Sequence, residues 1–567
     1  MSMHSSDGAD AVFRTLLSWG VDRVYICPGS TEAAFLDASL DHPEIELVLT
    51  AHEAVSVAMA DGYARATGRP GIVYVHTHLG LANGLAHLYC AHLERSPVVV
   101  IAGIKAQALH GADGFTTTTD IRSLPRQFVK WDWQTLRVEE IATDLDRALR
   151  IATTGPPGPT FLAIPQDVLE AKGQIPLAKR LGPSDVGRGA RPSPDPAPSP
   201  GLLDEAASLL MGAARPVIVL GGSAVWPEIA PEAAALSAVT GAVLLLEDKR
   251  SIAASAPPGP LAGYAGGLDH APGLVHEADL LLLAGARTPL RFEESGSLGF
   301  PRATRLHLIE DAGEVAKGPS EVLALRGDVR QGLRDLVARC EALAAADGVE
   351  VRDAHEFRRK ACAAYANRLR EQQDRAEEQS AHTPIAVSAV MQTLVGAVRP
   401  GTLLVDDSVT SKGEMLQRVL APTSRSPYLT TAGGSLGWGM AAATGAAHAL
   451  PDTPVVAVVG DGVFQFGVQA LFTAVLERIP LTYVVINNRG YAAVKAALRR
   501  FDGNALSRGV FPAADLSCQD ITAIARGYGA EAYRAETVEQ LRELLTRPVS
   551  QVPIVIDMVT DQDDFGP

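Results

Sequence analysis

The stretch that decides the fold is VVAVVGDGVFQFGVQALFTAVLERIPLTYVVINNRGY, residues 455–491. Its first five residues form a continuous, mostly β-branched run, and so do residues 482–486, as is typical of buried parallel strands. Helix-patterned residues lie between the two runs. A strand, a helix and a second strand in this order predict one unit of an open, mainly parallel α/β sheet.

Polar residues follow both predicted strands. Asp461, between two glycines, follows the first strand, and Asn488 follows the second. Because the carboxyl ends of neighbouring parallel strands lie side by side, we expect both side chains at one ligand-binding edge. Carboxylate and amide oxygens are ligands that Mg²⁺ or Ca²⁺ prefers, and the glycines let backbone N–H groups approach a phosphate. Either motif alone is explained as a turn or a strand end, but together they predict a metal and phosphate site.

Similar strand-like runs alternate with helical stretches along most of the chain. This alternation predicts three open, doubly wound α/β domains with mainly parallel sheets. Two seams separate them, one rich in Pro, Gly and Ser and the other a charged helical stretch. The expected order is a first domain at 1–172, a Pro-rich linker at 173–200, a middle Rossmann-like domain at 201–345, a connecting helix at 346–383 and a third domain at 384–567.

Composition restricts the class of partner and the compartment. With 50 Lys and Arg against 65 Asp and Glu, the formal net charge is -15, which argues against nucleic acid or an anionic membrane as a partner. Five dispersed cysteines without a CxxC pair are typical of reduced thiols. Neither a signal-peptide pattern nor an apolar run long enough to span a bilayer is visible, so we expect a cytoplasmic protein.

The GDG and NN pair at this separation resembles the diphosphate- and magnesium-binding motif of thiamine-diphosphate (ThDP) enzymes. The resemblance implies ThDP and Mg²⁺ as cofactors, with Ca²⁺ as an alternative ion. It makes Asp461, Asn488 and the backbone carbonyl of Gly490 the metal ligands. The residues that it places at the cofactor in this segment are Gly462, Val463 and Tyr491.

A second motif, HEAVSVAMADGYAR at 52–65, contains Glu53. On local grounds, a glutamate at a helix start is explained by the helix dipole. H-E-A followed by A-D-G-Y-A-R, however, resembles the pyrimidine-domain signature of the decarboxylase and acetolactate-synthase superfamily. The resemblance implies that Glu53 is the acid that activates the cofactor's aminopyrimidine. It also implies a homodimer or homotetramer in which the pyrimidine-binding first domain and the diphosphate-binding third domain face each other across an interface.

Two further motifs of the first domain are similar to the benzoylformate-decarboxylase-like branch of this superfamily. CPGSTEAAFLDA (27–38) implies Ser30 at the substrate carboxylate, and VYVHTHLG (73–80) implies His76 beside the reacting carbon. Without the resemblance, Ser30 is explained equally well as a helix N-cap. A lone histidine is usually structural, but the place of His76 at a strand end favours a functional role.

Two motifs of the third domain resemble the same branch. TTAGGSLGWGMAAATG (430–445) implies that Leu436 bends the cofactor and that the Gly434 carbonyl binds its 4′-amino group. Without the resemblance, Leu436 is explained as core. DDSVTS (406–411) implies Ser408 near the substrate and Thr410 near the diphosphate.

The sequence departs from this branch where a second catalytic histidine is expected. The corresponding segment, GARTPLRFEESGS (285–297), contains no histidine. Of the paired histidines of pyruvate and indolepyruvate decarboxylases, only His110 lies near the expected place. No clean GxGxxG follows a strand in the middle domain, so we expect this domain to bind neither FAD nor ADP.

The helix expected at 491–501 also departs from the branch. Small residues stand where an aryl-specific decarboxylase has bulkier ones, which leaves room for a larger substrate or for an acceptor; they are Ala492, Ala493, Val494 and Ala497. Lys495 is an added charge that we expect on a solvated face.

The expected function is a ThDP- and Mg²⁺-dependent decarboxylase or C–C lyase acting on a 2-oxo acid, with carboligation to an aldehyde or ketone as an additional activity. The alternative is a carboligase of the acetolactate-synthase type. Against it, the chain ends within a few residues of its last predicted strand (553–559), without a long tail. A third interpretation, a catalytically silent ThDP-binding protein, is disfavoured by Glu53.

Overall fold

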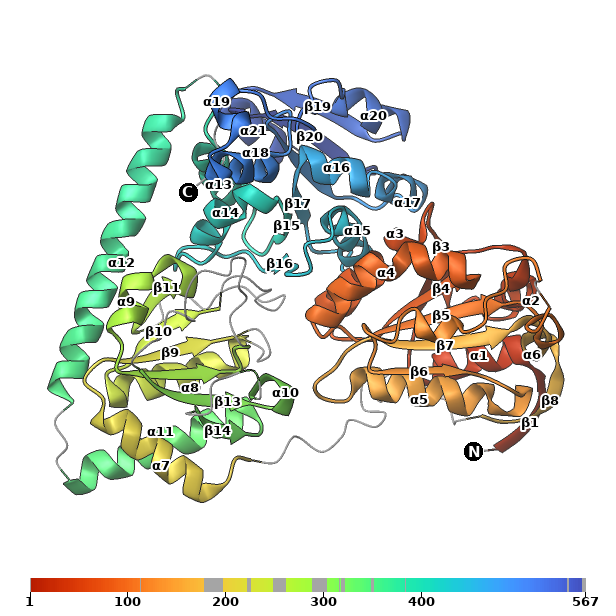
Figure 1. Ribbon diagram of the computed structural model, residues 1–567, viewed down its shortest axis with the longest axis horizontal. Helices are drawn as coiled ribbons and strands as arrows, with labels where there is room; N and C mark the ends of the chain where they lie inside the picture. The colour runs from red at the N-terminus through yellow and green to blue at the C-terminus, as the bar shows by residue number, and fades with distance from the viewer. Residues whose placement is uncertain are drawn as a thin grey trace.

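The computed structural model describes residues 2–562, apart from 113, 178–196, 222–225, 248–261, 288–302, 316, 318–321, 348–350, 383 and 548–549. The described part contains three six-stranded sheets, each with helices packed against it (Figure 1). Neighbouring strands in all three sheets are parallel. The prediction of three open α/β domains with parallel sheets is therefore confirmed.

The first and the third domain share one strand order. Numbered from the first strand of each sheet, both run 2-1-3-4-6-5. In spatial order the first sheet contains β3 (Glu46–Leu49), β2 (Arg23–Cys27), β4 (Gly71–His76), β5 (Val98–Ile104), β7 (Thr160–Pro165) and β6 (Trp131–Gln134). The third contains β16 (Tyr428–Thr430), β15 (Leu403–Asp407), β17 (Val455–Gly460), β18 (Thr482–Asn487), β20 (Ile554–Val559) and β19 (Glu531–Ala535). In both sheets the order reverses beside the first strand, the place where open α/β sheets bind ligands.

Both faces of these sheets are buried, which explains why their strands are continuous apolar runs. In β4, Val73 and Val75 belong to the apolar core on one face, and Ile72 and Tyr74 belong to the core on the other. Apart from the helix that contacts the third domain, which is described below, the helices of the first domain are α1 (Gly8–Ser18), α2 (Ala33–Ala38), α4 (Thr77–Leu93), α5 (Ile141–Thr153) and α6 (Gln166–Glu170). Those of the third are α13 (Val387–Ala397), α14 (Lys412–Val419), α16 (Asp461–Gly467), α17 (Ala470–Leu476), α20 (Ile521–Gly527) and α21 (Val538–Leu545).

The middle domain has the strand order 3-2-1-4-5-6 within its own sheet, which is the order of dinucleotide-binding folds. Its strands are β11 (Tyr264–Gly267), β10 (Val243–Leu246), β9 (Pro216–Leu220), β12 (Leu280–Ala284), β13 (Thr304–Ile309) and β14 (Val322–Arg326). Its helices are α7 (Pro200–Gly212), α8 (Trp226–Thr240), α9 (Pro272–Glu277), α10 (Ala312–Val315) and α11 (Val329–Asp347). Residues 222–225, which follow β9, lie outside the described residues, so the expectation that no FAD or ADP binds here stays a prediction.

The connections between domains differ in kind. Helix α12 (Arg352–Gln379) covers the stretch for which a connecting helix was expected and runs from the middle domain to the third domain (Figure 1). The expected Pro-rich linker begins with a strand, β8 (Lys172–Leu177), which pairs antiparallel with β1 (Ser2–Asp7). Residues 178–196 of that linker lie outside the described residues. No described helix is long and apolar enough to cross a membrane.

Helix α3 (Glu53–Thr67) of the first domain packs against α15 (Trp438–Ala449) of the third. The crossing is made by small residues: a Cβ on Gly62 would overlap the Ala442 carbonyl, and one on Gly445 would overlap the Met59 carbonyl. At one end of the crossing, the Trp438 indole N–H donates to the buried Asp61 carboxylate at 2.7 Å. The first and third domains are thus joined by closely packed backbones.

Gly62→Ala tests this crossing. The added methyl group must separate the two helices, so we expect the free energy of unfolding to fall by about 1–3 kcal/mol. Thermal and urea unfolding of the purified protein measure the change. Gly396→Ala in α13 is the matched control, because a Cβ at that position meets no atom within 4 Å. An unchanged stability of Gly62→Ala would contradict the close packing.

Candidate active site

Asp461 and Asn488 lie at neighbouring strand ends, as the sequence predicts. Asp461 is the first residue of α16, directly after β17, and Asn488 directly follows β18. The backbone N–H of Gly490 donates to Asp461 Oδ2 at 3.0 Å and also lies 3.1 Å from Asn488 Oδ1. The carboxylate and amide oxygens therefore converge on one point, although the sequence places them 27 residues apart.

The electrostatics of this point suit a cation. Burial raises the pKa of Asp461 to about 6, because the ionised carboxylate has lost much of its solvation. The Gly490 carbonyl, the third predicted ligand, accepts from the Ala492 N–H at 3.0 Å and has a second lone pair. Among the described residues no cluster of three or more His, Cys, Asp or Glu is placed to hold a metal ion. The donor set is thus all oxygen and includes a single carboxylate, which fits Mg²⁺ better than a transition metal.

A cavity of about 160 Å³ adjoins these groups. Predicted cofactor residues that line it are Ser408, Thr410, Leu436, Gly462, Val463 and Tyr491. The Ser408 hydroxyl is buried and makes no hydrogen bond to any described residue, as expected if it serves a ligand. A Cβ on Gly462 would lie 2.6 Å from the Tyr491 ring, so only glycine fits beneath that ring. Gly434 does not line this cavity and takes a left-handed conformation (φ 64°) in the preceding loop.

Glu53 begins α3, at the carboxyl edge of the first sheet. Its Oε2 accepts from the Asn83 amide at 3.0 Å, and its Oε1 would lie 2.8 Å from a Cβ on Gly80. Burial, together with the nearby Glu53 charge, raises the pKa of the Cys27 thiol to about 11. Glu53 therefore contacts the Asn83 amide and, through a side-chain hydrogen bond, Cys27, and the lack of a side chain at Gly80 leaves space beside its Oε1.

His76 is held by a buried carboxylate that sequence reasoning missed. Its Nδ1 lies 3.0 Å from Oε2 of Glu32, whose side chain is fully buried, and 3.0 Å from the Thr31 hydroxyl. The same Glu32 oxygen accepts from the Gly29 N–H at 2.6 Å. A Cβ on Gly29 would overlap the His76 ring. Because Nδ1 is engaged, Nε2 is the nitrogen left for another partner.

Ser30 begins a short 3₁₀ helix, Ser30–Glu32, of which Gly29 is the N-cap. The alternative that Ser30 caps a helix is therefore wrong. Its side chain is exposed, two positions from Glu32 and at the same sheet edge as His76. Ser30 and His76 are thus brought together at the edge that also carries Glu53.

Glu32→Gln tests the support of His76. A neutral amide fixes the imidazole tautomer less well and does not stabilise an imidazolium, so we expect kcat to fall by about 10- to 100-fold. Affinity for ThDP, measured by fluorescence titration, should stay unchanged, because the cofactor cavity lies in another domain. Glu44→Gln, an exposed change in the same domain, is the control. Unchanged turnover of Glu32→Gln would show that Glu32 does not support His76 in catalysis.

The remaining candidates fall in different places. Lys495 is half-buried, and its Nζ would lie 2.9 Å from a Cβ on Gly490, so this charge lies beside the predicted metal ligands, although it does not line the cavity. Arg287 is buried and bonds to the Leu93 carbonyl of the first domain. The rest of the histidine-free segment, from 288 to 297, lies outside the described residues. The cavity that contains Leu436 and Asp461 is not lined by Ser30, Glu53 or His76.

Comparison with known proteins agrees with this geometry. Three family models match the chain: the N-terminal TPP binding domain of thiamine pyrophosphate enzymes at residues 6–124, their central domain at 203–336 and their C-terminal TPP binding domain at 410–558. Thiamine pyrophosphate is another name for ThDP. The three matches correspond to the three sheets of the structure.

Two curated relatives and one solved structure are similar to the chain over nearly its whole length. The benzoylformate decarboxylase of Pseudomonas aeruginosa is 30% identical, covering 97% of this chain and 98% of that protein. The large subunit of acetolactate synthase isozyme 3 of Escherichia coli is 27% identical, covering 99% and 96%. The crystal structure of benzoylformate decarboxylase from Polynucleobacter necessarius superimposes with a TM-score of 0.81 over 98% and 99% of the two chains, at 23% identity, and supports the fold alone.

Family models over all three domains, a relative at 30% identity and the converging oxygens of the third domain lead to one conclusion. The chain belongs to the thiamine pyrophosphate enzymes and is a ThDP-dependent enzyme of their decarboxylase and carboligase group.

Proposed function

We propose that this enzyme is a ThDP- and Mg²⁺-dependent decarboxylase of a 2-oxo acid. The observation that carries the proposal is the histidine at the end of β4: His76 is held through Nδ1 by buried Glu32, beside Ser30 and on the sheet edge that carries Glu53. This arrangement suits proton transfer to a substrate carbon. The similarity to a benzoylformate decarboxylase supports the same reaction class.

The third domain would hold the cofactor. Asp461, Asn488 and the Gly490 carbonyl would bind Mg²⁺, whose charge would compensate that of the diphosphate. Residues assigned to the organic part and the diphosphate of ThDP are Gly434, Leu436, Ser408, Thr410, Gly462, Val463 and Tyr491. When bound, the cofactor supplies an electron sink for cleavage of the bond next to the substrate carbonyl.

Residues of the first domain would carry the protons. Glu53 holds a proton at the aminopyrimidine ring, with Asn83 fixing its direction. The Ser30 hydroxyl donates a hydrogen bond to the substrate carboxylate. The C1–C2 bond of the substrate breaks, CO₂ leaves, and His76 delivers a proton to the carbon that becomes an aldehyde.

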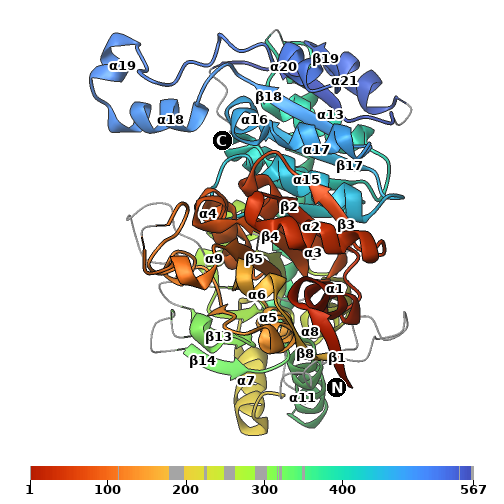
Figure 2. The same ribbon diagram turned by 90° about the vertical axis from the view of Figure 1, so that its right-hand side faces the viewer.

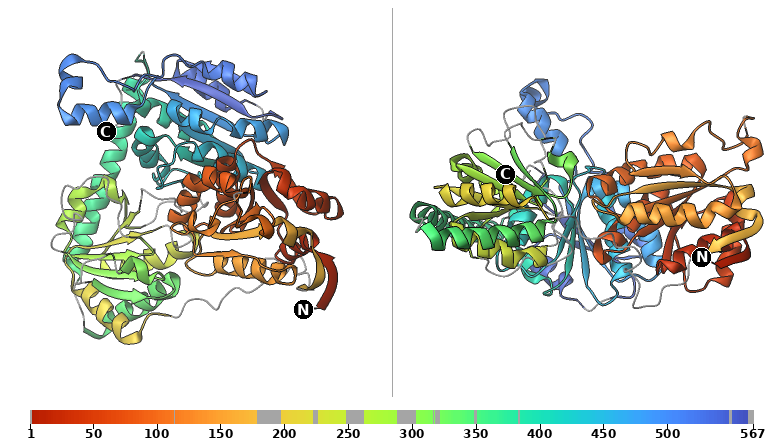
Figure 3. Two further views of the ribbon diagram at one scale, coloured as in Figure 1. Left: turned by 45° about the vertical axis from the view of Figure 1, so that its right-hand side comes forward. Right: turned by 90° about the horizontal axis from the view of Figure 1, so that it is seen from below.

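The two halves of this site would meet between subunits of a homodimer or homotetramer. Helices α18 (Ala492–Phe501) and α19 (Asn504–Arg508) form an arm that projects from the third domain (Figures 2 and 3). Phe501 on this arm is 81% exposed and Val510 is 61% exposed. Exposed apolar groups next to a half-site favour a second copy of the chain as their cover. We place the assembly in the cytoplasm, since the five cysteines are free and a reducing compartment keeps such thiols reduced.

A panel of 2-oxo acids tests the proposal. Purified protein with ThDP and Mg²⁺ is incubated with aliphatic, aromatic and acidic 2-oxo acids, and CO₂ and aldehyde are measured. We expect at least one substrate to give equal amounts of both. If no member of the panel loses CO₂, the decarboxylase proposal fails.

A second candidate is carboligation. Ala492, Ala493 and Val494 line the cavity at Asp461 and leave space where bulkier side chains would fill it. The acetolactate synthase relative supports this alternative. Benzaldehyde added to the panel discriminates the two. In a carboligase the substrate carbon left after CO₂ loss bonds to the benzaldehyde carbonyl, so a hydroxyketone forms at the expense of the aldehyde product, whereas a pure decarboxylase leaves the yield of that aldehyde unchanged.

A further inference from the structure

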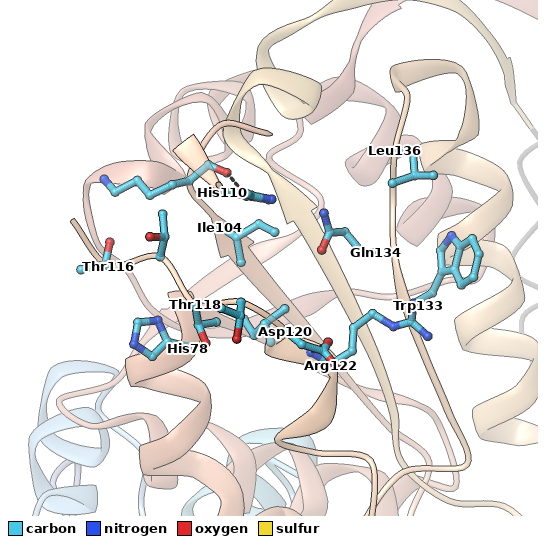
Figure 4. Close-up of a pocket in the computed structure, with 14 residues that line it drawn as sticks. His78, Ile104, His110, Thr116, Thr118, Asp120, Arg122, Trp133, Gln134 and Leu136 are labelled. Atoms are coloured by element: carbon cyan, nitrogen blue, oxygen red, sulfur yellow. Dashed lines mark hydrogen bonds between the residues drawn. The ribbon is translucent and has the colours of Figure 1, made fainter. Parts of the chain in front are cut away.

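A second cavity, of about 260 Å³, lies at the carboxyl edge of the first sheet (Figure 4). His78 and Thr116 lie on one side of it, and Trp133 and Leu136 lie on the other. The rest of its wall is formed by Ile104, Lys105, His110, Gln134 and the segment from Thr117 to Arg122. Most of the lining residues thus have side chains that are cationic or able to form hydrogen bonds.

Three polar groups of this cavity lack partners among the described residues. His78 Nδ1 and the Thr116 hydroxyl are both buried without a hydrogen bond. The Lys105 ammonium, on a half-buried side chain, has neither an ion pair nor a hydrogen bond within the described part of the chain. Buried polar atoms without partners are rare in folded proteins, so the two on His78 and Thr116, together at one cavity, indicate a ligand. Thr116 is also held at φ 58°, a conformation that costs energy for a β-branched residue and recurs at binding sites.

The other charges of the cavity balance one another. Arg122 Nε donates to Asp132 at 2.6 Å, and its guanidinium stacks over the Trp133 ring. The Asp120 carboxylate accepts from the Arg122 N–H and lies 3.9 Å from Arg126. Lys105 is therefore the charge left unbalanced by described groups, in a chain whose formal net charge is -15. An anionic group is the ligand that such a site favours.

The cavity adjoins the candidate catalytic residues. His76 pairs with Gly103 across β4 and β5, so Lys105 lies two residues beyond the level of His76 on the adjacent strand. His78 lies two residues after His76, at the start of α4, the helix that also carries Gly80 and Asn83 against Glu53. A molecule that reacts at His76 can thus extend along this edge into the cavity.

We propose that this cavity binds a second acidic group of the substrate, so that the preferred substrates are 2-oxo acids with a distal carboxylate. The inference rests on the proposed 2-oxo acid decarboxylase activity and adds the substrate class. Lys105 donates a charge-assisted hydrogen bond to the distal carboxylate, and Thr116 and His78 complete its hydrogen bonds. The reacting carboxylate stays at Ser30 and His76.

Comparison of matched substrates tests the proposal. We expect kcat/KM for 2-oxoglutarate to exceed that for 2-oxohexanoate, an analogue of similar length that lacks the distal carboxylate, by about 10- to 100-fold. Lys105→Met should remove most of this ratio by lowering only the value for 2-oxoglutarate. Lys172→Met, on β8 of the same domain, is the control and should leave the ratio unchanged.

Binding of glutarate, a dicarboxylate that cannot react, gives an independent measurement. Glutarate should change the tryptophan fluorescence of the ThDP-loaded wild type, and the change should be lost in Trp133→Phe and weakened in Lys105→Met. If 2-oxo acids without a distal carboxylate react while kcat/KM for 2-oxoglutarate is no higher and Lys105→Met is without effect, this inference is overturned and the decarboxylase proposal stands. If no 2-oxo acid reacts, the decarboxylase proposal itself fails, whereas glutarate binding still reports on the cavity.

Discussion

Glu53→Gln is expected to lower kcat by about 1,000-fold while leaving cofactor binding intact. The carboxyl group is the only part removed, and the amide keeps its size and its contact with Asn83. The groups proposed to bind the diphosphate and metal lie in the third domain, so affinity for ThDP and Mg²⁺ should change little. The decisive measurement is exchange of the C2 proton of bound ThDP with deuterium, followed by rapid-quench NMR, which should slow by a similar factor.

Two controls make this result specific. Glu44→Gln changes an exposed glutamate of the same domain and should leave both exchange and turnover unchanged. Thermal unfolding of Glu53→Gln should match the wild type, because the side chain is only partly buried. Rapid proton exchange in Glu53→Gln would show that another group activates the cofactor.

Asp461→Asn is expected to weaken Mg²⁺ binding by at least about 100-fold, and ThDP binding with it. The stability of the metal-free protein, by contrast, should change little. Because burial raises the pKa of Asp461 from 3.8 to about 6, the ionised carboxylate disfavours the folded state above pH 6, and this cost is absent below pH 3.8. At pH 7.5 Asp461→Asn removes the free-energy cost of the buried charge. It also weakens one of the hydrogen bonds that the Gly462 and Gly490 N–H groups donate to the side chain. We therefore expect the stability of the apoprotein to stay within about 1 kcal/mol of the wild type.

The two adjacent asparagines provide a matched pair for this prediction. Asn488 faces Asp461 across the Gly490 N–H, whereas the Asn487 amide donates to buried Asp557 at 2.7 Å. Thermal unfolding with and without Mg²⁺ and ThDP should show that Asn488→Ala loses the ligand-induced rise in Tm. Asn487→Ala should lower the Tm of the apoprotein and keep the rise. The reverse pattern would contradict the assignment of the metal ligands.

The sequence predicted the fold and the third-domain half of the site because both depend on local patterns. Continuous apolar runs indicate parallel strands, and two polar residues at the ends of consecutive strands must meet at one edge. The convergence of Asp461 and Asn488 on Gly490 therefore follows from topology alone. That the first and third domains share a strand order was not predictable, because their side chains differ and strand order is set by contacts distant in sequence.

The first-domain half was less predictable because its partners come from separate elements. Glu32 lies in an apolar stretch, and its burial requires a compensating partner. That partner, His76, is 44 residues away on another strand, and nothing in the local pattern of either residue points to the other. Lys495 is a second such case: its place in a predicted helix suggests a solvated face, but the fold brings its Nζ close to Gly490.

The crossing of α3 and α15 also limits how this enzyme can be recombined with its relatives. Gly62 and Gly445 each fit against a backbone carbonyl of the opposite helix, so the two surfaces are complementary at the level of single methyl groups. A chimera that takes its first domain from one parent and its third from another would combine helices never selected to fit. Exchange of the middle domain alone leaves this contact untouched, but it has to preserve others, such as the ion pair of Arg95 with Asp311.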